Sequence, residues 1–189
     1  MGRESLITIT QLKKALKDLP PEDLVRLITD VAQACPQARE FLTVRFADKS
    51  SAENILDSYK QKVKYEFFPP RGLGRLNLRE AKKAISDFKK ICPDKNMTID
   101  LMLFYVENCV DFTREYGDVY ESFYNSAVSM YSSVVNEINA ADIALYEKYA
   151  DRLRTAAENA CAGWGFQDEM MDIYYSIMWL EDDDADGEQ

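Results

Sequence analysis

The sequence predicts an all-α protein, built either as an irregular helical bundle or as a short stack of antiparallel helix pairs, with about eight or nine helices. Apolar residues recur at helical spacing along most of the chain, and no stretch alternates apolar and polar residues as a half-buried strand does. Only 7 glycines and 6 prolines occur among 189 residues, which favours long regular elements over a turn-rich β fold. No repeat of fixed period is evident, which weakens the stacked alternative.

Three helices are expected in the N-terminal part. The first carries a leucine stripe and ends at Pro20, and the second is expected near 22–35. Pro21 suits the first turn of that second helix, because the missing N–H of proline has no partner there in any case. A short third helix is expected around 41–46.

The next part of the chain predicts two helices separated by the one obvious loop. Ser51 is expected to cap a helix over 51–67, and the loop covers 71–76. Asn77 then opens a helix over 77–92, with Glu80 three residues later in the manner of a capping box.

A central helix is expected near 98–116, because this segment is apolar almost all round. Its one polar stripe is formed by Glu107, Asp111 and Glu115, which are spaced by four residues. Such a helix is typical of the middle of a protein, where other helices cover most of its surface.

Helices at roughly 119–138 and 142–161, followed by a last helix, complete a single domain over 1–180. Residues 181–189 contain six acidic side chains and predict a disordered acidic tail.

Charge is distributed very unevenly along the chain. The formal net charge is -10, yet residues 1–95 carry a net charge of +6 and residues 96–189 a net charge of -16. Within 65–90, seven lysines and arginines face only three acids. This local excess predicts a binding surface for an anion or an acidic partner on a chain that otherwise repels polyanions.

The candidate site is the glycine-containing loop at 71–76 together with the start of the helix that follows it. Glycines let backbone amides converge, a helix N-terminus adds partial positive charge, and arginine forks suit carboxylate or phosphate. The predicted binding residues are Arg71, Gly72, Gly74, Arg75, Arg79, Lys82 and Lys83.

The alternatives for this loop are two nucleotide-binding motifs and an internal pairing of its arginines. The spacing matches neither the dinucleotide-binding fingerprint nor the P-loop, which needs GxxxxGK[ST]. The arginines also suit internal pairing with the Glu107, Asp111 and Glu115 stripe, in which case they would bind no partner.

No catalytic residue, metal site or cofactor is predicted. The chain has no histidine, so the Glu-x-x-His pairs of di-metal bundles are impossible. Acids that share a helix face, such as Asp168 with Asp172 or Glu147 with Asp151, leave a carboxylate-based enzyme open, but solvated helix faces explain them better.

The four cysteines are expected to be reduced, because they lie apart in apolar helical patterns. With no signal-peptide pattern and no apolar run long enough to span a membrane, this favours a cytoplasmic protein without membrane contact.

Several segments resemble an uncharacterised bacterial family catalogued as a domain of unknown function. They read LKKALKDLPPEDLVRLI, EFFPPRGLGRLNLREAKKAISDFKK, DLMLFYVENCVDFTREYGD and GWGF, and the resemblance covers most of 10–178. It implies a small, intracellular, all-helical bacterial protein of the Bacteroides group, and it brings no activity or catalytic residues with it.

The function expected from these observations is a non-enzymatic protein-interaction module. Its 71–90 surface would bind an acidic protein or a phosphate-bearing ligand. The alternative is a nucleic-acid-associated protein that uses the same surface, although the acidic balance of the whole chain disfavours it.

Overall fold

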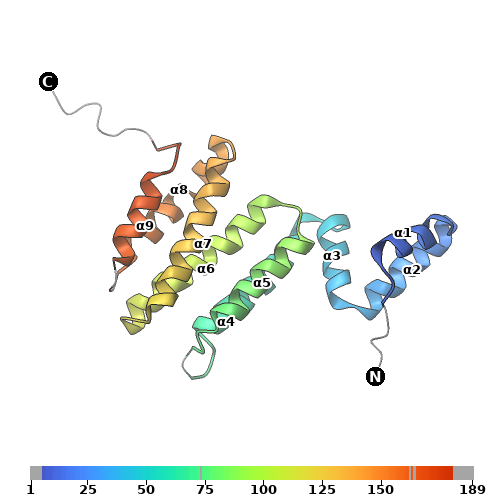
Figure 1. Cartoon of the computed structure of the whole chain (residues 1–189), viewed down its shortest axis with the longest axis horizontal. Helices are drawn as coiled ribbons and strands as arrows, with labels where there is room; N and C mark the ends of the chain where they lie inside the picture. The colour runs from blue at the N-terminus through green and yellow to red at the C-terminus, as the bar shows by residue number, and fades with distance from the viewer. Residues whose placement is uncertain (1–5, 73, 162, 164, 181–189) are drawn as a thin grey trace.

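The computed structural model describes residues 6–72, 74–161, 163 and 165–180. Within these ranges the chain forms nine α-helices and no β-strand, which confirms the predicted all-α class (Figure 1). The acidic tail predicted at 181–189 lies outside the described residues. The helices are α1 (Ile9–Lys17), α2 (Pro21–Ala34), α3 (Pro36–Phe46), α4 (Lys49–Phe67), α5 (Leu78–Ile91), α6 (Lys95–Tyr116), α7 (Glu121–Asn139), α8 (Ile143–Glu158) and α9 (Phe166–Tyr175).

The body of the protein is a short stack of helix pairs. Consecutive helices pair as α4 with α5, α6 with α7, and α8 with α9. Neighbouring pairs are joined mainly where α4 contacts α6, α6 contacts α8, and α7 contacts α9. Each pair therefore buries one face against the next, which is how stacked helical proteins form a continuous core.

Helix α6 lies at the centre of this stack, as its almost entirely apolar sequence predicts. Leu101, Leu103 and Tyr105 are completely buried. The Tyr105 ring packs edge-on against the Phe67 ring of α4, with 5.5 Å between ring centroids. Phe123 of α7 lies 6.4 Å from the same Phe67 ring, so one aromatic cluster joins three helices.

The predicted Asn77 cap of α5 is confirmed, without the reciprocal Glu80 side-chain bond of a capping box, whereas the Ser51 cap predicted for α4 is wrong. The Asn77 side chain accepts a hydrogen bond from the Glu80 N–H, as a helix N-cap does. Helix α4 begins earlier than expected, because Asp48 is its N-cap and accepts a hydrogen bond of 2.8 Å from the N–H of Ser51. Ser51 thus lies in the first turn of α4, and the aspartate three residues before it supplies the capping oxygen.

The N-terminal helices are arranged differently from the rest. Helix α3 packs against α4 and α5, while α2 contacts α3 and extends away from the body with α1 (Figure 1). None of the residues in α1, α2 or α3 is buried. This part of the chain therefore contributes little to the core described above.

Candidate functional site

The predicted loop folds back tightly onto the end of α4. The Leu76 N–H donates a hydrogen bond of 2.9 Å to the carbonyl oxygen of Glu66. A Cβ atom at Gly74 would lie 2.1 Å from the Phe67 carbonyl oxygen, so no other residue fits there without moving the backbone. Gly72 has a φ of 79°, in the left-handed region that glycine adopts most readily. The shape of the turn therefore requires Gly74 and favours Gly72, whatever the loop binds.

Helix α5 presents its basic side chains on the side opposite the core. It buries Ala81, Ile85 and Phe88, and its basic residues lie on the other side of the helix. The charged members of the predicted site are all exposed; they are Arg71, Arg75, Arg79, Lys82 and Lys83. The loop and the exposed side of α5 thus form one basic surface, here called the 71–90 surface.

Only part of the 71–90 surface is neutralised by neighbouring acids. Lys83 lies 3.6 Å from Glu80, and Lys90 lies 2.7 Å from Asp87, each pair within one turn of α5. Among the residues that the structure describes, no acid forms an ion pair with the remaining four basic members of the predicted site: Arg71, Arg75, Arg79 and Lys82.

The internal pairing weighed for the loop arginines is not found for the described residues. Glu107 instead accepts two hydrogen bonds from Arg152 of α8, of 2.7 Å from Nε and 2.9 Å from Nη2. Glu107 therefore pairs with α8, a helix far from the loop in the sequence, and not with the loop arginines.

Arg152 belongs to an ionic network that joins α4, α6 and α8. Asp100 of α6 lies 2.8 Å from the Lys60 ammonium and 2.5 Å from Arg152 Nη1. Burial alone would raise the pKa of Asp100, but the hydrogen bonds from Lys60 and Arg152 outweigh it and hold that pKa below its ordinary value. The sequence analysis did not predict this network. The spacing of seven residues between Asp100 and Glu107 places both acids on one face of α6, and it could have indicated a shared partner.

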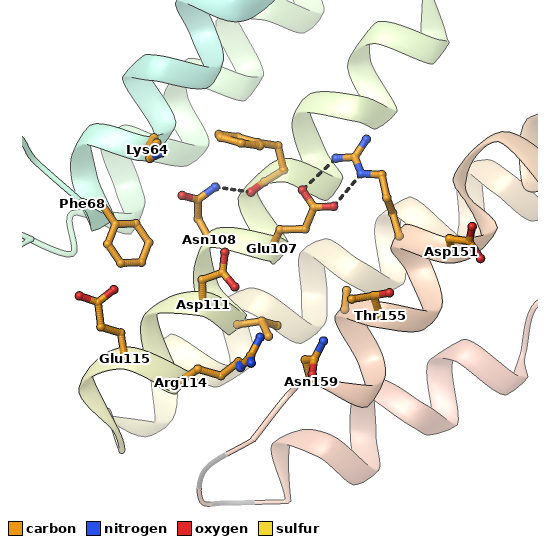
Figure 2. Close-up of a pocket in the computed structure, with 14 residues that line it drawn as sticks. Lys64, Phe68, Glu107, Asn108, Asp111, Arg114, Glu115, Asp151, Thr155 and Asn159 are labelled. Carbon is orange, nitrogen blue, oxygen red and sulfur yellow. Dashed lines mark hydrogen bonds and ion pairs between the residues drawn. The ribbon is translucent and has the colours of Figure 1, made fainter.

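An open groove of about 880 Å³ runs beside this network, between α4, α6 and α8 (Figure 2). The polar stripe predicted on α6 lies along its middle, Lys64 and Phe68 line one side, and residues of α8 line the other (Figure 2). Buried Asn108 also lines the groove and donates a hydrogen bond of 2.6 Å to the Phe104 carbonyl oxygen. Residues labelled in Figure 2 include Lys64, Phe68, Asp111, Arg114, Glu115, Asp151, Thr155 and Asn159.

The groove carries charged side chains of both signs, and several of them pair with one another. Glu107 and Arg152 neutralise each other, and Asp151 lies 3.2 Å from Arg154 on its own helix. No cluster of three metal-ligating side chains occurs within the described ranges. The other carboxylate pair considered for catalysis, Asp168 with Asp172, is exposed on α9.

The four cysteines occupy different environments. Cys92 and Cys109 are buried, and burial raises the pKa of both thiols. Cys35 is half-buried between α2 and α3. The expectation of an apolar helical position is wrong for Cys161, which is exposed and follows the end of α8.

Cys161 is therefore expected to react first with a thiol reagent in the native protein, and Cys109 last, because a buried thiol with a raised pKa supplies little thiolate. The rate of Ellman's reagent modification measures this, and Cys161→Ser should remove the fast phase. In denaturant without reductant, all four thiols should react. A fast phase that persists in Cys161→Ser, or fewer than four reactive thiols, would contradict this expectation.

None of the described helices is long and apolar enough to cross a lipid bilayer.

The fold and the site together define a small all-helical protein with a basic loop-and-helix surface. Residues 7–177 match the family of unknown function DUF6155, and the chain belongs to that family. No curated protein and no solved structure matches the chain.

Proposed function

We propose that this protein is a non-enzymatic interaction module whose 71–90 surface binds an acidic protein. The observation that carries the proposal is the set of exposed basic side chains without an ion-pair partner among the described residues: Arg71, Arg75, Arg79 and Lys82. Arginine forks bind carboxylates in two-point contacts, so an acidic protein surface or a phosphorylated segment suits them.

The charge of the remaining chain supports a protein partner over nucleic acid. A net charge of -10 repels a long polyanion, while a compact acidic patch can approach the 71–90 surface alone. The proposal includes a cytoplasmic location, because the cytoplasm is a reducing compartment in which free cysteines persist.

Reversing two of the loop charges tests this proposal. The double variant Arg71→Glu/Arg75→Glu should lose its partner in affinity capture from the native lysate, because two attractive contacts become repulsive. Its free energy of unfolding should change little, since an exposed charge contributes only about 0–1 kcal/mol. Captured proteins identified by mass spectrometry and a urea denaturation curve provide the two measurements.

The matched control is Lys49→Glu/Lys95→Glu, which makes the same change of charge at two exposed lysines outside the 71–90 surface. It should retain the partner. A large loss of stability with capture unchanged would show that the loop arginines act inside the fold. Capture that disappears after nuclease treatment would replace the protein partner with nucleic acid.

A further inference from the structure

The N-terminal arm, defined as residues 6–34, exposes the apolar side chains that its amphipathic helices would be expected to bury. The exposed fraction is 67% for Ile9, 65% for Val25 and 51% for Ile28. Leu12, Leu27 and Val31 are also exposed, and no residue of α1 or α2 is buried. Single exposed apolar residues are ordinary, but a contiguous set at helical spacing marks an interaction surface.

The pattern in α1 is that of a helix–helix seam. Its apolar residues recur at alternating intervals of three and four, as in the seam of a coiled coil. They are Ile9, Leu12 and Leu16, and Leu19 continues the spacing in the turn after α1. Leu16 is half-buried, whereas Ile9 is 67% exposed and Leu12 and Leu19 are 36% and 37% exposed, so the described chain covers this seam only in part.

Helix α2 has apolar side chains around about half of its circumference, from Leu27 on one side to Val25 on the other. This is wider than the stripe of about 100° by which a surface helix packs against its own core. Helices α1 and α3 adjoin α2 in the chain, yet Val25, Ile28 and Val31 remain 65%, 51% and 46% exposed, which indicates a further helical partner.

The charges that flank these apolar faces show which partner fits. Helix α1 carries only lysines among its charged residues, and Lys13 and Lys17 flank its seam. Helix α2 carries Asp23 and Asp30 beside Leu27. A basic α1 and an acidic α2 are complementary across two copies in a two-fold arrangement that places α1 of each copy against α2 of the other.

The position of the arm also supports a second copy of this chain as its partner. The body stacks helix pairs face to face, and the arm lies at the N-terminal end of this stack with its apolar surface uncovered (Figure 1). A stacked helical protein needs a polar face at its ends to remain soluble. The same arm of a second copy would cover this end with a helix pair of matching length.

We propose that the N-terminal arm binds the arm of a second copy of this chain, so that α1 and α2 of the two copies form a symmetric four-helix contact. This contact is separate from the 71–90 surface and does not depend on the function proposed for it.

Sedimentation velocity on the full-length protein tests the dimer. The wild-type chain should sediment at twice the 21.7 kDa of one chain. Val25→Glu/Ile28→Glu places two charges in the apolar contact and should sediment as a monomer. The matched control is Arg26→Glu, which changes the net charge by the same amount on the polar side of α2 and should remain a dimer.

Folding is monitored independently of assembly. Because the arm buries no residue in the core, Val25→Glu/Ile28→Glu should keep the helical circular dichroism signal of the wild type. A wild-type chain that is monomeric at all concentrations overturns the proposal, and binding of that monomer to anionic phospholipid vesicles would assign the arm to a membrane surface. Equal dissociation in the variant and the Arg26→Glu control would also overturn it.

A mixing experiment tests the pairing of α1 with α2. Lys13→Glu/Lys17→Glu makes both helices of the arm acidic, whereas Asp23→Lys/Asp30→Lys makes both basic. Each variant alone should dimerise about tenfold more weakly, because several attractive pairs become repulsive. An equimolar mixture should restore the dimer as a heterodimer. Failure of the mixture to associate more strongly than either variant would exclude this arrangement.

Discussion

Replacing Phe67 with alanine is expected to lower the free energy of unfolding by about 3–5 kcal/mol, the range found for large aromatic residues in a packed core. Phe67 is completely buried at the end of α4, and its ring contacts aromatic rings from α6 and α7. Removing it leaves a cavity where three helices meet, and helices joined by short loops cannot close that cavity completely.

Urea denaturation monitored by circular dichroism measures the loss, and the melting temperature should fall by on the order of 10 °C for a chain of this size. Tyr65→Ala is the matched control, because it removes an aromatic ring from the same helix where the side chain is 50% exposed. It should cost no more than about 0.5 kcal/mol. Similar losses in the two variants would show that Phe67 does not hold these helices together.

The helices of this protein follow closely from local sequence. Amphipathic periods predicted α2, α5 and α6 to within about three residues at each end, because the stripe that packs against neighbours has the period of the helix itself. The start of α4 was missed because Asp48 and Ser51 are both good capping residues. Which one caps a helix depends on the backbone conformation before it, which the sequence does not display.

The partners of the charged residues were far less predictable. Periodicity shows that Glu107, Asp111 and Glu115 share a face of α6, but not which helix lies opposite. In the structure that helix is α8, whose Arg152 binds Glu107. Pairing across helices is a property of the tertiary arrangement, so a local basic segment such as 71–90 could be recognised while its neighbours could not.

The sequence of the N-terminal arm likewise predicts its helices but not the surface that covers them. Its leucine and valine stripes correctly predicted two helices, since an apolar stripe forms wherever a helix packs on something. The pattern is identical whether the covering surface belongs to the same chain or to another. Only the exposure of side chains such as Val25 and Ile28 shows that the body does not cover them.

Asp100 is the residue whose removal should most disturb the ionic network between α4, α6 and α8. Asp100→Asn keeps the shape of the side chain but removes the charge that Lys60 and Arg152 both contact. We expect a loss of about 2 kcal/mol at pH 7, less than the 3–5 kcal/mol measured for fully buried pairs, because these side chains are 21–34% exposed.

The stability lost in Asp100→Asn should depend on pH, and the lowered pKa of Asp100 determines the direction of this dependence. A carboxyl group whose pKa is lower in the folded than in the unfolded protein contributes stability above the unfolded pKa, and loses it as the pH falls through the folded pKa. The ordinary value for this group is 3.8. The stability difference between wild type and Asp100→Asn should therefore be complete at neutral pH and shrink as the pH falls below about 4.

Urea denaturation of both proteins at pH 7 and at pH 3 measures this contribution, because the two chains differ only at residue 100. Asp111→Asn is the control, since it removes the same charge from an exposed position on α6 and should change stability by no more than about 0.5 kcal/mol. A gap between wild type and Asp100→Asn that stays constant from pH 7 to pH 3 would mean that the lost contact is not ionic. A gap no larger than that of Asp111→Asn would mean that the contacts of Asp100 with Lys60 and Arg152 add nothing measurable to stability.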